Sequence, residues 1–118
     1  MKDQGTLRGD WGTYTGDIVN GRSNGKGKCI YSDGSVYEGD WVDDMCNGKG
    51  KLKNSIGEVY EGDFVNDKFH GRGKFTWPDG GRVYEGYFVD GEFNGYGKMT
   101  KYGNVVYEGN WTNGEPNT

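Results

Sequence analysis

Residues 37–52 read YEGDWVDDMCNGKGKL and carry several side chains that could do chemistry. Glu38 and Asp40 could serve as a general acid and a general base. Cys46 could act as a nucleophile, and the GKGK segment has the glycines and lysines of a phosphate-binding loop. A catalytic pair or a phosphate loop is expected once in a chain, so the rest of the sequence decides whether either is present.

The same pattern recurs along the chain. A segment that reads YEGDFVNDKFHGRGKF begins 23 residues after the first one. An additional glycine at Gly80–Gly81 accounts for one longer step in a series of 23, 23, 24 and 23 residues. Each residue therefore has counterparts in the other units, and a column of counterparts changes what a motif means. The units begin at Tyr14, Tyr37, Tyr60, Tyr84 and Tyr107.

The columns argue against catalysis at residues 37–52. Glu38 and Asp40 have counterparts at Glu61 and Asp63, which indicates a solvated, salt-paired column rather than an acid–base pair. The GKGK segments lack the spacing of a phosphate loop, and no helix is expected after them. They are interpreted as parts of strands.

The single histidine and the two cysteines also have structural interpretations. Cys29 and Cys46 are interpreted as small apolar fillers, because apolar residues stand in the same columns. We therefore predict that the chain is not an enzyme and has no metal site and no cofactor. His70 takes a turn-capping position that asparagine fills in the other units, at Asn24, Asn47 and Asn94.

The composition predicts one all-β domain over residues 1–118. Of the 118 residues, 24 are glycine, 15 % are aromatic and none is alanine, which disfavours helices and favours turns and strands. The net charge of −4 argues against nucleic acid as a partner. The N-terminus has no apolar signal segment and two cysteines make no disulfide framework, so we expect a cytoplasmic protein.

Each unit predicts one β-hairpin. A first strand of the form Y-x-G-x-aromatic leads into a turn of Asn, Asp or Gly, and a second strand reads G-x-G-K-apolar. Hairpins in series give an elongated, twisted, single antiparallel sheet with an open groove. Neighbouring strands lie about 4.8 Å apart, so equivalent residues should recur about every 10 Å and the units should span roughly 45 Å.

Aromatic columns gather on one face of the predicted sheet. Glycines beside the rings leave room for a ring to lie over the backbone. Two interpretations stay open: the rings stack on one another and close the groove, or they form a surface for a partner. Trp77 and Tyr96 break their columns, which favours specific contacts. The predicted groove residues are Tyr37, Trp41, Tyr60, Phe64, Trp77, Tyr84, Phe88 and Tyr96.

Charged columns occupy the opposite face. Glutamates lie on the first strands and lysines on the second strands, where they can pair across the sheet. The lysines are the predicted contacts if the chain binds anionic lipid, although the glutamates beside them largely cancel the field. They are Lys28, Lys51, Lys74 and Lys98.

The repeated pattern resembles the MORN repeat (membrane occupation and recognition nexus) from residue 14 to residue 115. Thr15 and Ile18 depart from that pattern, and Asp44 and Asp67 replace a turn glycine. The resemblance implies a curved sheet of hairpins, used as scaffolding beside membranes and cytoskeleton or as an accessory module on enzymes such as phosphatidylinositol phosphate kinases. The predicted units are a degenerate half unit at 5–13, full units at 14–36, 37–59, 60–83 and 84–106, and a partial unit at 107–118.

We expect a non-catalytic scaffold that binds a protein segment, helical or extended, along the aromatic groove. Self-association into a homodimer is also expected, because the strand at residues 107–111 is predicted to lack a following partner strand. The alternatives are phosphoinositide binding at a membrane surface and a regulatory repeat module of a larger lipid-kinase-like enzyme. In each case the protein could sit at the periphery of a membrane or of the cytoskeleton.

Overall fold

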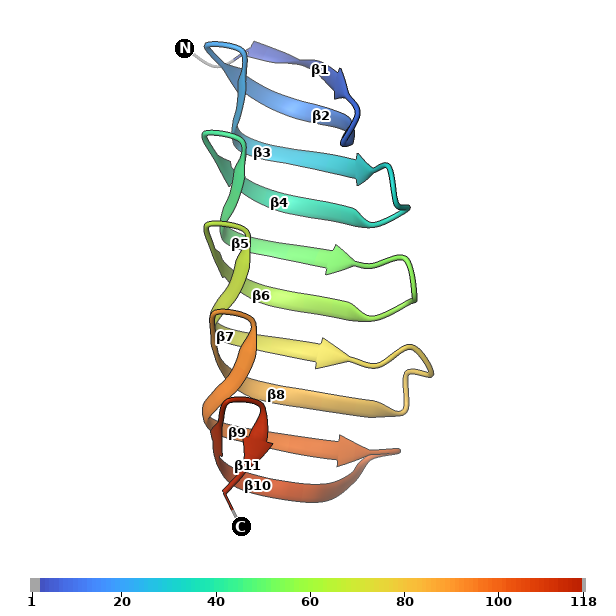
Figure 1. The fold of residues 1–118 in the computed structure, drawn as a ribbon, viewed down its shortest axis with the longest axis vertical. Coiled ribbons are helices and arrows are strands. Elements are labelled where there is room, and N and C mark those ends of the chain that lie inside the picture. Colours follow the sequence, from blue (N-terminus) through green and yellow to red (C-terminus); the bar gives the residue numbers. More distant parts are fainter. Residues whose placement is uncertain (1–2, 118) are drawn as a thin grey trace.

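The computed structural model describes residues 3–117, which form a single antiparallel sheet with the strands in sequence order (Figure 1). The sheet is 48 Å long, close to the length predicted from strand spacing, and the all-β prediction is confirmed. No helix among the described residues is long and apolar enough to cross a membrane. The strands of residues 3–117 are β1 (Asp3–Gly9), β2 (Gly12–Val19), β3 (Arg22–Tyr31), β4 (Val36–Val42), β5 (Met45–Lys53), β6 (Val59–Val65), β7 (Lys68–Thr76), β8 (Arg82–Val89), β9 (Glu92–Lys101), β10 (Asn104–Thr112) and β11 (Glu115–Pro116).

Two-residue turns close the hairpins at one side of the sheet. Both turn residues have a positive φ, for example 51° at Asn20 and 76° at Gly21. This is the type I′ turn, whose twist matches that of the flanking strands and which Asn, Asp and Gly tolerate best. The turn predictions are confirmed at Asn20–Gly21, Asp43–Asp44, Asn66–Asp67, Asp90–Gly91 and Asn113–Gly114.

Side chains of one unit cap the turn of the next. Asn24 Oδ1 accepts a hydrogen bond from the Asp43 N–H at 3.0 Å. His70 Nδ1 accepts one from the Asp90 N–H at 3.4 Å, so the turn-capping role predicted for His70 is confirmed. These bonds tie neighbouring hairpins together at the turns.

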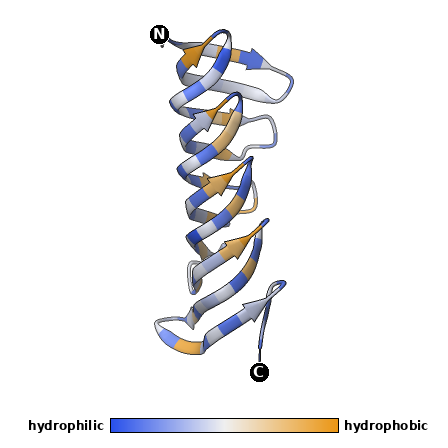
Figure 2. Ribbon diagram, turned by 90° about the vertical axis from the view of Figure 1, so that its left-hand side faces the viewer, coloured by the Kyte–Doolittle hydropathy of each residue, from blue (hydrophilic) through white to orange (hydrophobic). Residues whose placement is uncertain are grey.

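A ladder of aromatic rings forms the core on the inner face of the sheet. Tyrosines alternate with Trp or Phe, and each ring meets the next edge to face, with centroids 4.9 to 5.4 Å apart. This arrangement places the positive edge of one ring on the negative face of the next. Figure 2 shows the alternation of hydrophobic and hydrophilic residues along the curved strands. The ladder runs Tyr14, Trp41, Tyr37, Phe64, Tyr60, Phe88, Tyr84, Trp111, Tyr107.

Glycines lie beneath the tyrosine rings. A Cβ added at Gly50 would collide with the hydroxyl and ring of Tyr37, and one at Gly73 would collide with Tyr60 in the same way. The Tyr60 hydroxyl donates to the Asp63 carbonyl at 2.6 Å, which holds the ring along its own strand. The prediction that glycine makes room for a ring over the backbone is confirmed.

The first strand completes a half unit. β1 pairs with β2 so that Leu7 lies opposite Tyr14, in the register that Cys29 takes with Tyr37. β1 therefore takes the place of the second strand of a hairpin. Its apolar residue, Leu7, extends the column to which Cys29 belongs.

The prediction that residues 107–111 lack a following partner strand is wrong in part. The Asn113–Gly114 turn reverses the chain, and β11 pairs with β10 at Trp111 and Thr112. The Asn117 N–H also donates to the Asn110 carbonyl at 2.9 Å. The two-residue turn chemistry is thus sufficient to begin another strand.

The remainder of β10 pairs with β9 alone among residues 3–117, so self-association through this edge stays a prediction. An open strand edge favours pairing with a second copy. Light scattering should show a mean mass that rises with protein concentration over roughly a hundredfold range, as mass action requires. A constant monomer mass over that range would contradict the expectation.

Candidate partner-binding groove

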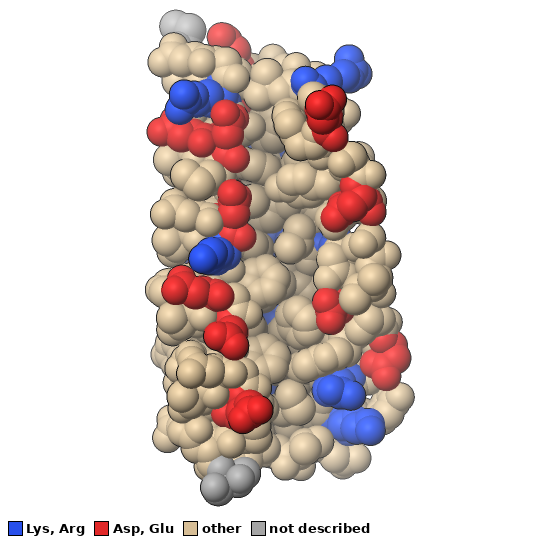
Figure 3. Space-filling view, viewed as in Figure 1, with Lys and Arg blue, Asp and Glu red and all other residues tan. Residues whose placement is uncertain are grey.

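The inner face is hollowed over the N-terminal half of the sheet. A cleft of about 880 Å³ runs there from β1 to the turn after β6. Figure 3 looks into this face and shows uncharged side chains along the middle, with most of the charged side chains on the two rims. The residues that line the cleft include Tyr31, Ser23, Cys29, Trp41, Asp44, Cys46, Leu52, Phe64 and Asp67.

The C-terminal half of the groove is filled by the chain's own rings. Phe69 lies flat on Tyr60, with centroids 3.8 Å apart and 5° between the planes. Phe93 lies on Tyr84 in the same way, at 4.0 Å and 13°. The cleft lining accordingly ends at Asp67, just before Phe69.

Short side chains keep the N-terminal half open. Ser23 and Cys46 stand at the positions that Phe93 and Phe69 take in later units. Both are buried on the cleft floor, but neither carries a ring that reaches into the groove. The repeat thus builds a filled half and an open half from one backbone plan.

The column that holds Tyr31, Asn54 and Trp77 also changes side-chain size from unit to unit. The Tyr31 hydroxyl reaches to 3.8 Å from Cys46 Sγ, so a large side chain faces a small one. In the next unit the equivalent residues are Asn54, whose side chain bonds within its own turn, and Phe69. In the third unit both side chains are large, and the ring centroids of Trp77 and Phe93 lie 5.8 Å apart. The three pairs are Tyr31 with Cys46, Asn54 with Phe69, and Trp77 with Phe93.

Two carboxylates belong to the wall of the open half. Asp44 Oδ1 accepts the Ser23 N–H at 2.8 Å, and Asp67 Oδ1 accepts the Cys46 N–H at 2.7 Å. These bonds explain why Asp replaces the expected turn glycine in two units. Because the donors in these two bonds are neutral backbone amides, they do not cancel the charge of the carboxylates, and this wall of the cleft is negative.

The two cysteines are inert by position. Burial raises the pKa of the Cys46 thiol and that of the Cys29 thiol, so both stay protonated near neutral pH. We expect a thiol-reactive dye to label the folded protein slowly and the unfolded protein at once. Labelling of folded protein as fast as that of a free thiol would contradict this placement.

The structure places six of the predicted groove residues in the core. Each is at most 5 % exposed, so these rings support the groove from below and offer little area to a partner. The stacking interpretation accounts for them, whereas contact with a partner stays a prediction. The six are Tyr37, Trp41, Tyr60, Phe64, Tyr84 and Phe88.

The other two predicted residues, Trp77 and Tyr96, lie on opposite faces of the sheet. Trp77 is half-buried on the inner face, where it packs on Phe75 at 4.8 Å and carries the Arg82 guanidinium over its ring at 4.9 Å. The assignment of Tyr96 to the groove is wrong. Side chains alternate along β9, and Tyr96 lies on the outer face, 52 % exposed, with its hydroxyl donating to Glu108 at 2.6 Å.

Only part of the cleft lining was predicted from the sequence, namely Tyr37, Trp41 and Phe64. Tyr31, Ser23, Cys46 and the two wall aspartates are not among the predicted groove residues. A signal was present, because the column that reads Ser, Cys, Phe, Phe changes size halfway along the chain. A column of unequal side chains on an inner face marks where the space is left open.

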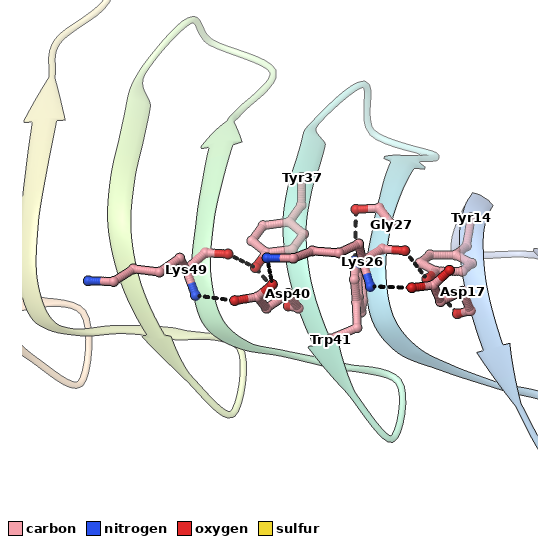
Figure 4. Close-up of polar contacts among 8 residues, drawn as sticks. All are labelled: Tyr14, Asp17, Lys26, Gly27, Tyr37, Asp40, Trp41 and Lys49. Carbon is pink, nitrogen blue, oxygen red and sulfur yellow. Dashed lines mark hydrogen bonds and ion pairs between the residues drawn. The ribbon is translucent and has the colours of Figure 1, made fainter. Parts of the chain in front are cut away.

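The outer face carries a chain of aspartates and lysines (Figure 4). Asp40 Oδ2 accepts the Lys49 backbone N–H at 2.9 Å, and its other oxygen pairs with the Lys26 ammonium of the preceding hairpin. Asp63 pairs with Lys49 in the same way. The pKa of Asp63 is lowered: partial burial opposes the shift, but the bonds to Lys49 and to the Arg72 N–H outweigh it.

The lysines predicted as lipid contacts belong to a neighbouring column. Lys28, Lys51 and Lys74 are exposed on the outer face, and Lys98 is half-buried. The register places a glutamate beside each of them, as expected, and Lys51 lies between Glu38 and Glu61. The ion pairs with Asp40 and Asp63 are formed by Lys26 and Lys49, which are not among the lysines predicted as lipid contacts.

Comparison with protein families gives one match that follows the repeats. The model of the MORN repeat matches residues 14–36, 37–59, 60–82, 84–103 and 107–117, and each matched segment begins at one of the five unit tyrosines. A search of curated proteins gives no match. Because the matched segments cover most of the sequence and the sheet is built from the corresponding hairpins, this chain belongs to the MORN repeat family.

Proposed function

We propose that this protein is a scaffold that binds a segment of a partner protein in the open, N-terminal half of its groove. One observation carries the proposal: the same backbone plan is filled by Phe69 and Phe93 in one half and left open by Ser23 and Cys46 in the other. An apolar floor with a polar rim is the usual make-up of a peptide-binding groove.

The family supports an interaction role in general terms. MORN repeats are non-catalytic modules that generally interact with proteins or membranes. The cleft floor holds buried apolar side chains, which favours a partner with apolar side chains of its own. A protein segment supplies such side chains on a backbone long enough to follow the groove.

The proposal is tested by a variant that closes the groove as the chain itself does. Tyr31→Asn/Cys46→Phe copies the Asn54 and Phe69 pair of the next unit, so the fold should be retained. Random peptides displayed on phage are selected on the unchanged protein and then measured on both proteins. We expect the selected peptides to lose at least about tenfold in affinity on the closed variant.

A matched control shows that the loss comes from filling. Tyr31→Asn alone removes a lining side chain without adding a ring, so the effect of the ring is the further loss of affinity from this single variant to the closed variant. Selected peptides that bind the closed variant as tightly as the unchanged protein would overturn the proposal.

Phosphoinositide binding is the alternative that the family keeps open. Each lysine in the exposed column has a glutamate as cross-strand neighbour, and the net charge is −4, so little attraction to an anionic surface is expected. Vesicles that contain phosphoinositides should pellet no more protein than neutral vesicles at physiological salt. Pelleting that Lys51→Glu/Lys74→Glu abolishes would instead support lipid recognition.

A further inference from the structure

We infer that the partner segment is an amphipathic helix with two aromatic side chains seven residues apart and with basic residues beside them. This inference rests on the proposed function, since it names the chemistry of the segment that the open groove accepts. It follows from three features of the chain: its own aromatic fillers, the pitch of its repeat and the charge of its groove wall.

The filled half of the groove serves as a template for the ligand. Phe69 and Phe93 stand one unit apart, and each packs against a ring of the ladder edge to face as well as lying on a tyrosine. In the open half, Ser23 and Cys46 mark two equivalent places one unit apart. An aromatic ring is therefore the side chain that this backbone plan is built to hold.

The partner's rings would rest on the short side chains. Tyr14 and Tyr37 are fully buried, so a ring would lie over Ser23 and Cys46 rather than directly on the tyrosines. Apolar surface for that ring comes from the partly buried residues of the cleft lining, such as Tyr31 and Leu52.

The pitch of the repeat sets the spacing. Two strands per unit place equivalent positions about 10 Å apart. Seven residues of helix rise about 10.5 Å and return to nearly the same face. Residues on one face of an extended strand recur at about 7 Å and again at about 13 Å, so a strand cannot reach both places with equivalent side chains. A helix with rings at positions i and i+7 fits.

The groove wall favours basic flanks. Asp44 and Asp67 also stand one unit apart, next to Ser23 and Cys46. The Oδ1 atom of each carboxylate accepts a hydrogen bond from a backbone amide, of Ser23 and of Cys46 respectively. Asp33 and Arg8 also line the cleft, so its lining holds three carboxylates against one guanidinium and stays negative. A Lys or Arg next to each aromatic residue would meet this wall, and the attraction would weaken with salt.

Synthetic helical peptides test the inference directly. The probe has about 18 residues, or five turns, with Phe at i and i+7 and Lys beside each Phe. The first control has the same composition with Phe at i and i+5, which puts the rings on different faces, and the second has Glu for Lys. Fluorescence anisotropy should give the probe an affinity at least about tenfold higher than either control.

Variants of the chain locate the effect. Tyr31→Asn/Cys46→Phe should remove the preference for the probe over the i+5 control. Asp44→Asn/Asp67→Asn keeps a side-chain oxygen for the two amides but removes the charge, and it should reduce the preference for Lys over Glu. A probe that binds no better than both controls, or that binds the closed variant equally well, would overturn the inference.

The two proposals fail in different ways. If the phage-selected peptides depend on the open groove but show neither the seven-residue spacing nor basic flanks, the helix inference is wrong and the groove function stands. If no peptide depends on the open groove, both are wrong.

Discussion

Replacing Trp41 with alanine should lower the free energy of unfolding by about 3–5 kcal/mol, the range found for large aromatic residues truncated in a core. Trp41 packs edge to face on Tyr14 and on Tyr37, at 5.1 Å in each case, and its Nε1–H donates to the Gly27 carbonyl at 3.0 Å. The change therefore breaks the ladder between two units and leaves the partly buried Gly27 carbonyl without this donor. Urea denaturation followed by circular dichroism measures it.

Two controls show that the ladder is responsible. Trp41→Phe installs the residue that Phe64 and Phe88 supply in later units, so it should cost only about 1 kcal/mol for the lost hydrogen bond. Trp11→Ala removes a ring that is 44 % exposed and should cost less than Trp41→Ala. A loss at Trp41→Ala no larger than that at Trp11→Ala would show that the ladder does not hold the units together.

Replacing Gly73 with alanine should cost about 3 kcal/mol, at the upper end of what overpacking usually costs. The new Cβ would collide with the hydroxyl and ring of Tyr60, which is buried and hydrogen-bonded and cannot move aside cheaply. The backbone at Gly73 has no positive φ, so the cost comes from packing alone. Chemical denaturation gives the value.

Gly21→Ala is the matched control for this change. Gly21 has φ of 76° and nothing near its added Cβ, so only backbone strain of about 1 kcal/mol is expected. If Gly73→Ala were milder than Gly21→Ala, the tyrosine rings would not lie over the glycines as described.

The repeat made the backbone predictable from the sequence. A tyrosine every 23 or 24 residues gave the number of hairpins, and Asn, Asp or Gly pairs marked the two-residue turns. Period-two alternation assigned Tyr37 and Trp41 to the inner face, and both lie there. Several copies of one pattern supply evidence that a single strand would not.

The site was harder to predict, because it depends on how large residues cover one another. The ladder rings looked like a binding surface, but with glycine beneath them they pack together and are buried. Tyr96 was assigned to the groove because it is an aromatic residue that breaks its column, although the other members of that column, Lys26, Lys49 and Arg72, indicated the outer face. The cleft itself arises from short residues, and small side chains give little signal in a sequence.

The most direct test of the groove is a nuclear magnetic resonance titration of the labelled protein with a phage-selected peptide. The proposal predicts that the amide shifts cluster on residues that line the cleft, such as Ser23, Asp44 and Cys46, and that they vanish in Tyr31→Asn/Cys46→Phe. Shifts that cluster on the outer face around Lys51, or along the β10 edge, would show that the open half of the groove is not where this protein meets its partner.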